Sequence, residues 1–175
     1  KMLHQKSLPA IVIGILLLST QLIGNISHPN ITSKYYPLLM VGVTETTHQE
    51  SIHKLIKSGI GGILIYGKKI KDTQRLKKNI QNWQNLSNNP LLIAIDQENG
   101  WISRISFENP LPNNMGLGAT NAPFLSKIAG KITGRRLRKL GINMNMAPVL
   151  DINQDPNNPI IDRRSFGNNP KLVTQ

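Results

Sequence analysis

Five apolar residues, Leu91 to Ile95, follow one another without a polar interruption and end directly at Asp96. A strand with one face in water alternates apolar and polar side chains, so this unbroken run favours a strand covered on both faces, as in a parallel sheet. Parallel strands need a crossover connection, which is usually a helix. The run therefore favours an α/β fold.

Similar short apolar runs alternate along the chain with stretches of helical periodicity. The strand candidates are residues 38–43, 61–66, 91–95 and 142–150, and the helix candidates are residues 44–58, 72–87 and 123–140. Thr44 and Asp72 are expected to cap the first and second helices. Strands that alternate with helices at this spacing predict a parallel sheet with right-handed crossovers.

The third helix candidate has one apolar and one basic face. Its apolar face is expected to bury Phe124, Ile128, Ile132 and Leu137, at intervals of four, four and five residues. The other face carries six lysines and arginines, and we expect it to be solvated.

The N-terminal 24 residues are expected to export the chain or to anchor it. Two lysines within Lys1–Lys6 precede the almost wholly apolar Leu8–Gly24, which is the order of an export signal. This apolar stretch is also near the lower length limit of a spanning helix, so an uncleaved anchor and a buried core helix remain open. We expect an exported or membrane-anchored protein of the bacterial envelope, or a cytoplasmic one if the segment is not a signal. Residues 25–36 would then link it to a domain over residues 37–175.

The net charge of +12 would suit nucleic acid, an anionic membrane or an acidic polymer. The lysines are scattered, few aromatics lie among them and no nucleic-acid motif is present, so we expect a solvated basic surface and no nucleic-acid partner. A membrane-anchored basic protein that acts at an anionic surface is a weaker alternative. The chain has no cysteine, which excludes disulfides and thiolate metal sites.

Acidic side chains gather after the third and fourth strand candidates, where α/β folds place their sites. They are Asp96, Glu98, Asp151, Asp155 and Asp162. Asp96 with Glu98 or Asp151 would suit the acid and nucleophile of glycoside hydrolysis, whereas a surface ion pair at the strand end is the purely structural alternative. The acidic segment lacks a calcium-loop pattern and the histidines lack ligand spacing, so we expect no metal and no cofactor.

Three segments in register resemble glycoside hydrolase family 3. Residues 93–104, Ile-Ala-Ile-Asp-Gln-Glu-Asn-Gly-Trp-Ile-Ser-Arg, are similar to the signature after the third strand of that family. Residues 140–151 resemble its fourth-strand motif, and residues 158–167 resemble the loop that follows. Residues 61–65 fit the second strand. The likeness is greatest to bacterial β-N-acetylhexosaminidases that trim cell-wall muropeptides, with β-glucosidases of the family as a neighbouring possibility.

The resemblance implies a TIM (β/α)₈ barrel, here its first four β/α units, that hydrolyses terminal β-linked sugars with retention. It implies that Asp96 binds hydroxyls of the non-reducing sugar and that Arg104 and Arg164 line the same pocket, which replaces the carboxylate-pair hypothesis. The expected partner is a glycan that contains N-acetylglucosamine.

Three residues depart from the family pattern. Asn99 stands where the first Gly of a Gly-Gly pair is typical, and Asn tolerates a left-handed conformation, so we expect the turn with Gly100 to survive. Trp101 replaces a residue that is often basic. Asp162 replaces a Gly before the arginine loop, and is expected to strain that loop or to re-aim Arg164.

The family's catalytic groups are expected beyond residue 175, so we assign no catalytic residue within the chain. They are the general-acid His with its Asp partner and the nucleophilic Asp. The family's Lys-His-Phe-Pro-Gly-His-Gly stretch, which supplies more sugar contacts, is expected there as well. A covalent glycosyl-enzyme needs that nucleophile, and four strands leave a barrel open. We therefore expect the chain alone to be inactive and poorly stable as a monomer, with self-association or a missing C-terminal half as its partner. A non-catalytic carbohydrate- or partner-binding remnant is the alternative.

Overall fold

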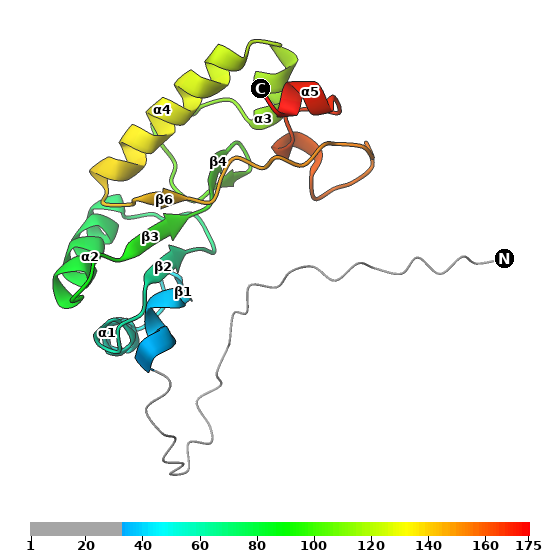
Figure 1. The fold of residues 1–175 in the computed structure, drawn as a ribbon. Helices are drawn as coiled ribbons and strands as arrows, with labels where there is room; N and C mark the ends of the chain where they lie inside the picture. The colour runs from blue at the N-terminus through cyan, green and yellow to red at the C-terminus, as the bar shows by residue number, and fades with distance from the viewer. Residues whose placement is uncertain (1–32) are drawn as a thin grey trace.

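The computed structural model describes residues 33–175 (Figure 1). The export or anchor segment expected at residues 1–24 lies outside the described residues, as does most of the linker expected at residues 25–36. Within residues 33–175, none of the helices has the length and apolar character needed to cross a bilayer.

Four parallel strands form the central sheet, in the order β1-β2-β3-β6 (Figure 1). They are β1 Met40–Val43, β2 Gly62–Ile65, β3 Leu92–Ile95 and β6 Met144–Asn145. Ile65 pairs with Val43 on one side and with Ile95 on the other, and Ile95 also pairs with Asn145. The carboxyl ends of the strands therefore meet at one edge, and β1 and β6 are the outer strands. This confirms the predicted parallel α/β fold.

The fourth strand is shorter than the predicted range of 142–150. Backbone pairing with β3 continues as far as Met146, whose N–H donates to Ile95 O at 2.8 Å. Pro148 has no backbone N–H, so it cannot extend a strand ladder. The chain leaves the sheet at this point and crosses its carboxyl edge as a loop.

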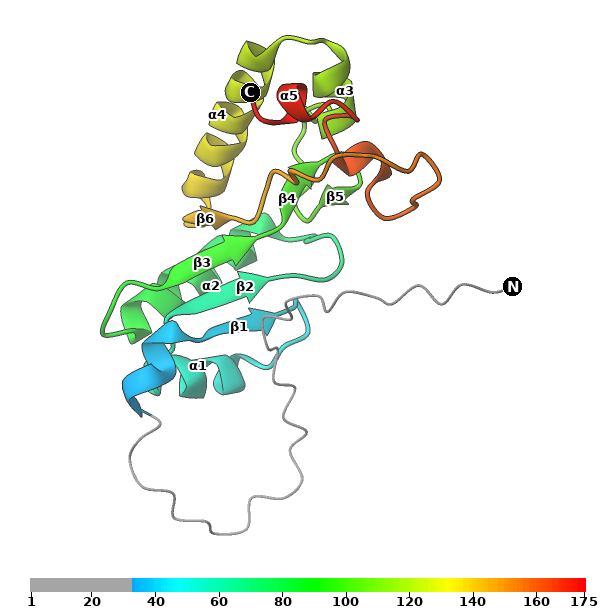
Figure 2. The ribbon, with the colours of Figure 1, turned by 45° about the vertical axis from the view of Figure 1, so that its right-hand side comes forward.

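Two amphipathic helices cover one face of the sheet (Figure 1, Figure 2). They are α1 Gln49–Lys57, which follows a short 3₁₀ helix at Ser33–Leu38 and β1, and α2 Thr73–Leu86. Their buried side chains are Ile52 and Ile56 on α1, and Leu76, Ile80 and Trp83 on α2. These pack on Ile63 and Ile93, which are fully buried in the sheet.

The predicted caps of these helices had different outcomes. The Asp72 side chain accepts a hydrogen bond from Arg75 N at 2.8 Å, so the N-cap of α2 is confirmed. The cap predicted at Thr44 was wrong, because α1 begins only at Gln49. Thr44 instead belongs to a turn, in which its N–H donates to Thr47 Oγ1 at 2.9 Å. The turn separates β1 from α1.

The long helix α4 spans Pro123–Lys139, close to its predicted bounds, but it presents a different face to the protein. Its buried residues are Ala129, Thr133 and Leu137, at intervals of four. Leu137 is therefore buried as predicted, whereas Phe124 is 63% exposed and Ile128 is 47% exposed. The helix packs through small side chains, and Thr133 Oγ1 accepts a hydrogen bond from Asn99 Nδ2 at 3.4 Å.

A short hairpin rises from the carboxyl end of β3 (Figure 2). Its strands are β4 Gln97–Asn99 and β5 Ile102–Ser103, which pair antiparallel. Asn99 has φ 70° and Gly100 has φ 66°, so both residues of the turn adopt the left-handed conformation that the sequence predicts for them. The remaining elements lie above the same edge of the sheet: α3 Asn114–Ala119, the 3₁₀ helix η2 Asp162–Arg164, and α5 Pro170–Val173.

Candidate functional site

Asp96 and Arg104 form an ion pair at the carboxyl end of β3. Asp96 directly follows the strand and Arg104 directly follows β5, so the hairpin returns the arginine to the aspartate. Arg104 Nη2 lies 3.5 Å from Asp96 Oδ2, and the two side chains are 24% and 30% exposed. Arg104 Nη1 also donates to Gly67 O at 2.7 Å, beyond the end of β2. The arginine thus joins the ends of two neighbouring strands while both charged groups remain accessible.

The Arg104 guanidinium has donor capacity to spare. Its Nε is buried and makes no hydrogen bond within the part of the chain that the structure describes. A buried donor without a partner carries a free-energy cost of about 1–3 kcal/mol.

Glu98 and Arg164 form a second, tighter ion pair. Arg164 Nε donates to Glu98 Oε2 at 2.9 Å, and Arg164 Nη2 donates to Glu98 Oε1 at 2.8 Å. The Glu98 side chain is 5% exposed and that of Arg164 is 29% exposed. The hydrogen bonds from Arg164 to Glu98 raise the pKa of Arg164, while burial opposes this shift and the nearby Asp151 and Asp96 add to it. Arg164 is therefore held as a cation close to Asp96.

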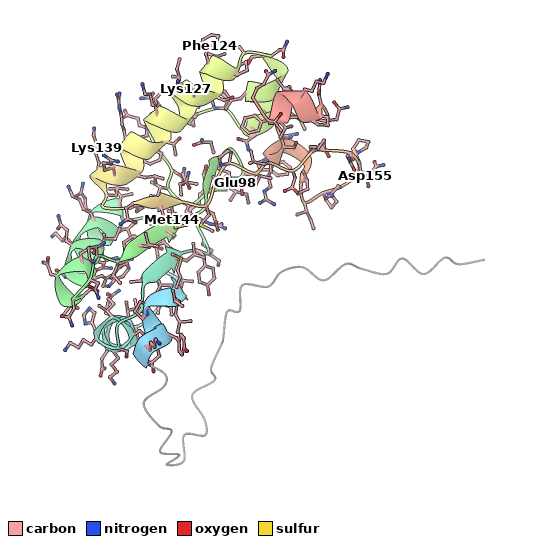
Figure 3. The ribbon with its side chains drawn as sticks, viewed as in Figure 1. Glu98, Phe124, Lys127, Lys139, Met144 and Asp155 are labelled. Atoms are coloured by element: carbon pink, nitrogen blue, oxygen red, sulfur yellow. The ribbon has the colours of Figure 1, made fainter. Side chains whose placement is uncertain are left out.

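This pairing separates the roles of the two carboxylates that the sequence brings together. Asp96 is half-exposed beside Arg104, whereas Glu98 is enclosed and bound at both oxygens by Arg164. Figure 3 shows Glu98 on the hairpin at the centre of this edge, and Asp155 on the outer part of the loop after β6. Sequence reasoning missed the Glu98–Arg164 pair, and no local pattern signals it, because 66 residues separate the partners.

Amide side chains hold the hairpin on the sheet. The Gln97 side chain is buried, donates to Ile105 O and accepts from Ile105 N, both at 3.0 Å. Asn145 in turn accepts from Gln97 N at 3.0 Å and donates to Gln97 O at 3.1 Å. Asn143 accepts from Ile93 N of β3 at 2.7 Å and donates to the O atom of Leu91, the residue before β3, at 2.9 Å. Asn143 and Asn145 thus add side-chain hydrogen bonds to the backbone pairing of β6 with β3, and Asn145 also holds the base of the hairpin.

The loop that carries Arg164 is fixed by its own buried polar group. Ser165 is fully buried, and its Oγ donates to Asp151 O at 2.6 Å. Asn114 Nδ2 of α3 donates to Arg164 O at 2.6 Å. Gly118 of α3 lies directly against the Phe166 carbonyl, so that a Cβ at this position would collide with it. These contacts determine where the Arg164 side chain starts, and its direction is then set by Glu98.

Two of the residues that depart from the family pattern lie together. The Arg163 guanidinium lies over the Trp101 ring, 4.9 Å from its centroid, and Arg163 Nε is 3.8 Å from Asp162 Oδ2. Asp162 has φ 31°, a positive value that an L-residue adopts only with strain, as expected for a position where Gly is usual. Arg164 still reaches Glu98 from this loop.

Among residues 33–175, Asp151 and Asp155 form no ion pair with Arg104 or Arg164, although Asp151 lies close enough to Arg164 to raise its pKa. Asp151 and Asp155 are exposed, and Asp155 Oδ1 accepts a hydrogen bond from Asn157 N at 2.9 Å within its own loop. Across residues 33–175, no three His, Cys, Asp or Glu side chains lie close enough together to hold a metal ion. The chemistry of the site therefore rests on the two carboxylate–arginine pairs.

Such an arrangement suits a neutral, hydroxyl-rich ligand. Carboxylates accept hydrogen bonds and guanidinium groups donate them, whereas a hydroxyl does both. With each arginine facing a carboxylate, the pairs present no excess of positive charge that would select a phosphate. The fold and the site thus define a parallel α/β protein with a polar, sugar-compatible site at the carboxyl ends of its strands.

The chain belongs to glycosyl hydrolase family 3, because residues 30–175 match the model of the family's N-terminal domain. It is 39% identical over 142 residues to Beta-hexosaminidase A of Pseudoalteromonas piscicida. The matched region covers 74% of this chain and 24% of that protein. It is 34% identical over 87 residues to the Beta-hexosaminidase LpqI of Mycobacterium tuberculosis. The matched region covers 49% of this chain and 22% of that protein. These findings confirm the resemblance seen in the sequence.

Solved structures agree with the fold. A family 3 beta-N-acetylglucosaminidase from Paenibacillus sp. superposes with a TM-score of 0.76 at 37% identity, covering 83% of this chain and 29% of that one. NagZ from Neisseria gonorrhoeae, in complex with N-trifluoroacetyl-D-glucosamine, superposes with a TM-score of 0.66 at 27% identity, covering 77% of this chain and 42% of that one. The four β/α units are thus part of a family 3 (β/α)₈ barrel, and the chain spans less than half the length of each of these relatives.

Proposed function

We propose that these residues form the sugar-recognition part of a family 3 glycoside hydrolase that releases terminal β-linked N-acetylhexosamine from cell-wall or related glycans. The observation that carries the proposal is the placement of Asp96, Arg104 and Arg164 at one edge of the sheet, with Glu98 holding Arg164 in position. In this proposal Asp96 accepts hydrogen bonds from the hydroxyls of the non-reducing sugar, and the two arginines donate to its oxygens.

The choice of sugar is supported by the relatives rather than by the geometry of the site. Relatives in sequence and in structure are named as beta-hexosaminidases and as a beta-N-acetylglucosaminidase. We therefore propose N-acetylglucosamine as the terminal sugar. Residues 1–24 would place the protein in the bacterial envelope, either by export or as an anchor, a proposal that rests on the sequence pattern of that segment.

In this proposal, different parts of the barrel bind the sugar and hydrolyse the glycosidic bond. Retaining hydrolysis needs one carboxyl group as the acid and a second as the nucleophile, about 5–5.5 Å apart. In this proposal Asp96 binds sugar hydroxyls and Glu98 is enclosed by Arg164, so neither takes these roles. The 175 residues would then bind the sugar, and the groups that break the glycosidic bond would come from the rest of the barrel.

Binding can be tested directly on the full 175-residue chain by saturation-transfer NMR with N-acetylglucosamine. We expect transfer to the sugar protons with the native chain, and its loss with Asp96→Asn and with Arg104→Ala. Asp155→Asn is the matched control, because it removes an exposed carboxylate from the same edge of the molecule. Equal signals from the native chain and from Asp96→Asn would show that the sugar does not bind at this site.

A further inference from the structure

The tip of the β4–β5 hairpin carries a large aromatic surface that the fold does not use. Trp101 is 62% exposed and lies in the turn between two paired strands. The other tryptophan, Trp83, is 2% exposed, and its Nε1 donates to Gln49 Oε1 at 3.0 Å. Exposed apolar surface is unfavourable by about 25 cal/mol per Å², so an exposed tryptophan beside a binding site is a candidate contact for a ligand.

Arg163 holds this ring in place. Its guanidinium lies 4.9 Å from the ring centroid, and Arg163 itself is next to Asp162 at 3.8 Å. A cation over one face restricts the motion of the indole without burying it. A ligand that packs on the exposed part of the ring therefore meets a surface that is already oriented, which lowers the entropy lost on binding.

Trp101 and the proposed sugar site lie at opposite ends of the hairpin. Gln97 pairs with Ser103 at the base of the hairpin, next to Asp96 and Arg104, whereas Trp101 is in the turn. With a rise of about 3.4 Å per residue, the tip is about 10 Å beyond the base. On the other side, Arg163 directly precedes Arg164 in η2. Trp101 is thus linked to Asp96 and Arg104 through the hairpin, and to Arg164 through Arg163. It lies outside the proposed sugar site itself.

We propose that Trp101, oriented by Arg163, is a stacking platform for the second sugar ring of a β-linked oligosaccharide whose terminal ring occupies the site at Asp96, Arg104 and Arg164. The inference rests on the proposed function and extends it by one subsite. A β-linked pyranose with equatorial substituents presents axial C–H groups on its faces, and such a face packs well on an indole. Asp162 and Arg163 then lie beside the ring as hydrogen-bonding partners for its hydroxyl groups.

Tryptophan fluorescence of the full chain provides the test, since the buried Trp83 serves as an internal reference. We would titrate with N-acetylglucosamine and with its β-1,4-linked trimer, and measure emission together with protection from acrylamide quenching. The trimer should alter and protect the Trp101 emission and bind about tenfold more tightly than the monosaccharide. The monosaccharide should bind without protecting Trp101.

Three variants separate this inference from the proposed function. Trp101→Ala should bind both sugars with equal affinity, while Trp101→Phe keeps a ring and should retain part of the preference for the trimer. Arg163→Gln removes the cation over the ring and should reduce the preference. Arg104→Ala should lose both sugars. Circular dichroism should be unchanged in Trp101→Ala, because the side chain is not part of the core.

The outcomes are decisive in each direction. A preference for the trimer that survives in Trp101→Ala overturns the inference, as does the same affinity for both sugars in the native chain. Either result leaves the proposed function standing, provided that Arg104→Ala still loses N-acetylglucosamine. A Trp101 emission that responds to anionic vesicles and not to the trimer also overturns the inference. Failure of the native chain to bind either sugar overturns the inference and the proposed function together.

Discussion

Glu98 and Arg164 are 66 residues apart in the sequence and meet through two parallel hydrogen bonds of 2.9 and 2.8 Å. The pair connects the hairpin after β3 to the loop after β6, and it encloses the carboxylate while leaving part of the guanidinium accessible. Its geometry makes Glu98 a positioning residue for Arg164, and it leaves Asp96 as the accessible carboxylate of the site.

Removing the charge of Glu98 should weaken both the fold and sugar binding. Glu98→Gln keeps the shape of the side chain but replaces one acceptor oxygen with a donor that faces Arg164. We expect the free energy of unfolding to fall by about 1–3 kcal/mol, because the partner is only partly desolvated. Urea unfolding checks this value, with the exposed pair variant Glu50→Gln as control. A loss no larger than that of the control would contradict the role of Glu98.

The contribution of this pair should not change between neutral and moderately alkaline pH. Glu98 raises the pKa of Arg164. A basic group whose pKa is raised by folding contributes its full stability below the pKa of the unfolded chain, and loses it only as the pH rises through the higher folded value. The pH range in which this stability is lost lies above the usual pKa of arginine. A double-mutant cycle of Glu98→Gln and Arg164→Gln should therefore give equal coupling energies at about pH 7 and about pH 10, and a coupling that disappears at the higher pH would refute this assignment.

Gln97 should be more important for folding than its place between two acidic residues indicates. Gln97→Leu leaves the N–H and the C=O of the buried Ile105 without their partner. Each such group costs about 1–3 kcal/mol when it is left unsatisfied. Thermal unfolding should show a clear loss of stability for Gln97→Leu and little change for Gln74→Leu, where the glutamine is exposed on α2. Similar melting curves for the two variants would show that the hydrogen bonds between Gln97 and Ile105 do not stabilise the fold.

The two ends of α4 should respond differently to substitution. Leu137→Ala removes a buried side chain and should destabilise the protein by about 2–5 kcal/mol, whereas Phe124→Ser changes an exposed one and should have little effect. Figure 3 shows Phe124 at the outer end of the helix. Denaturant unfolding of the two variants in parallel is the measurement. A larger loss for Phe124→Ser would mean that this face of α4 is covered in solution.

The 175-residue chain should not hydrolyse an aryl β-N-acetylglucosaminide faster than its Asp96→Ala variant. Glu98 is enclosed by Arg164, and the accessible Asp96 is proposed to bind sugar hydroxyls, so neither is assigned as the nucleophile that a retaining mechanism needs. Release of the chromogenic aryl group from purified protein is the measurement. Turnover by the native chain above the rate of Asp96→Ala would show that these residues contain catalytic groups.

The sequence by itself determined the local features of this protein. The apolar run of β3, the cap at Asp72 and the left-handed turn at Asn99-Gly100 each depend on a few consecutive residues, and each is found where the pattern predicts it. The family motifs are local as well. They placed Asp96, Arg104 and Arg164 after particular strands, and parallel pairing then brings all three to one edge.

Only the tertiary structure decided which groups meet there. Three contacts join segments that are far apart in the sequence. They are the pairing of Glu98 with Arg164, the contact of Arg163 with Trp101, and the hydrogen bonds between the Asn145 side chain and the Gln97 backbone. The buried face of α4 belongs to the same category, because close packing selected the small Ala129 and Thr133 over larger apolar neighbours. Backbone propensity acts over one or two helical turns, whereas these contacts depend on the register of strands and on the packing of one element against another, which no short stretch of sequence encodes.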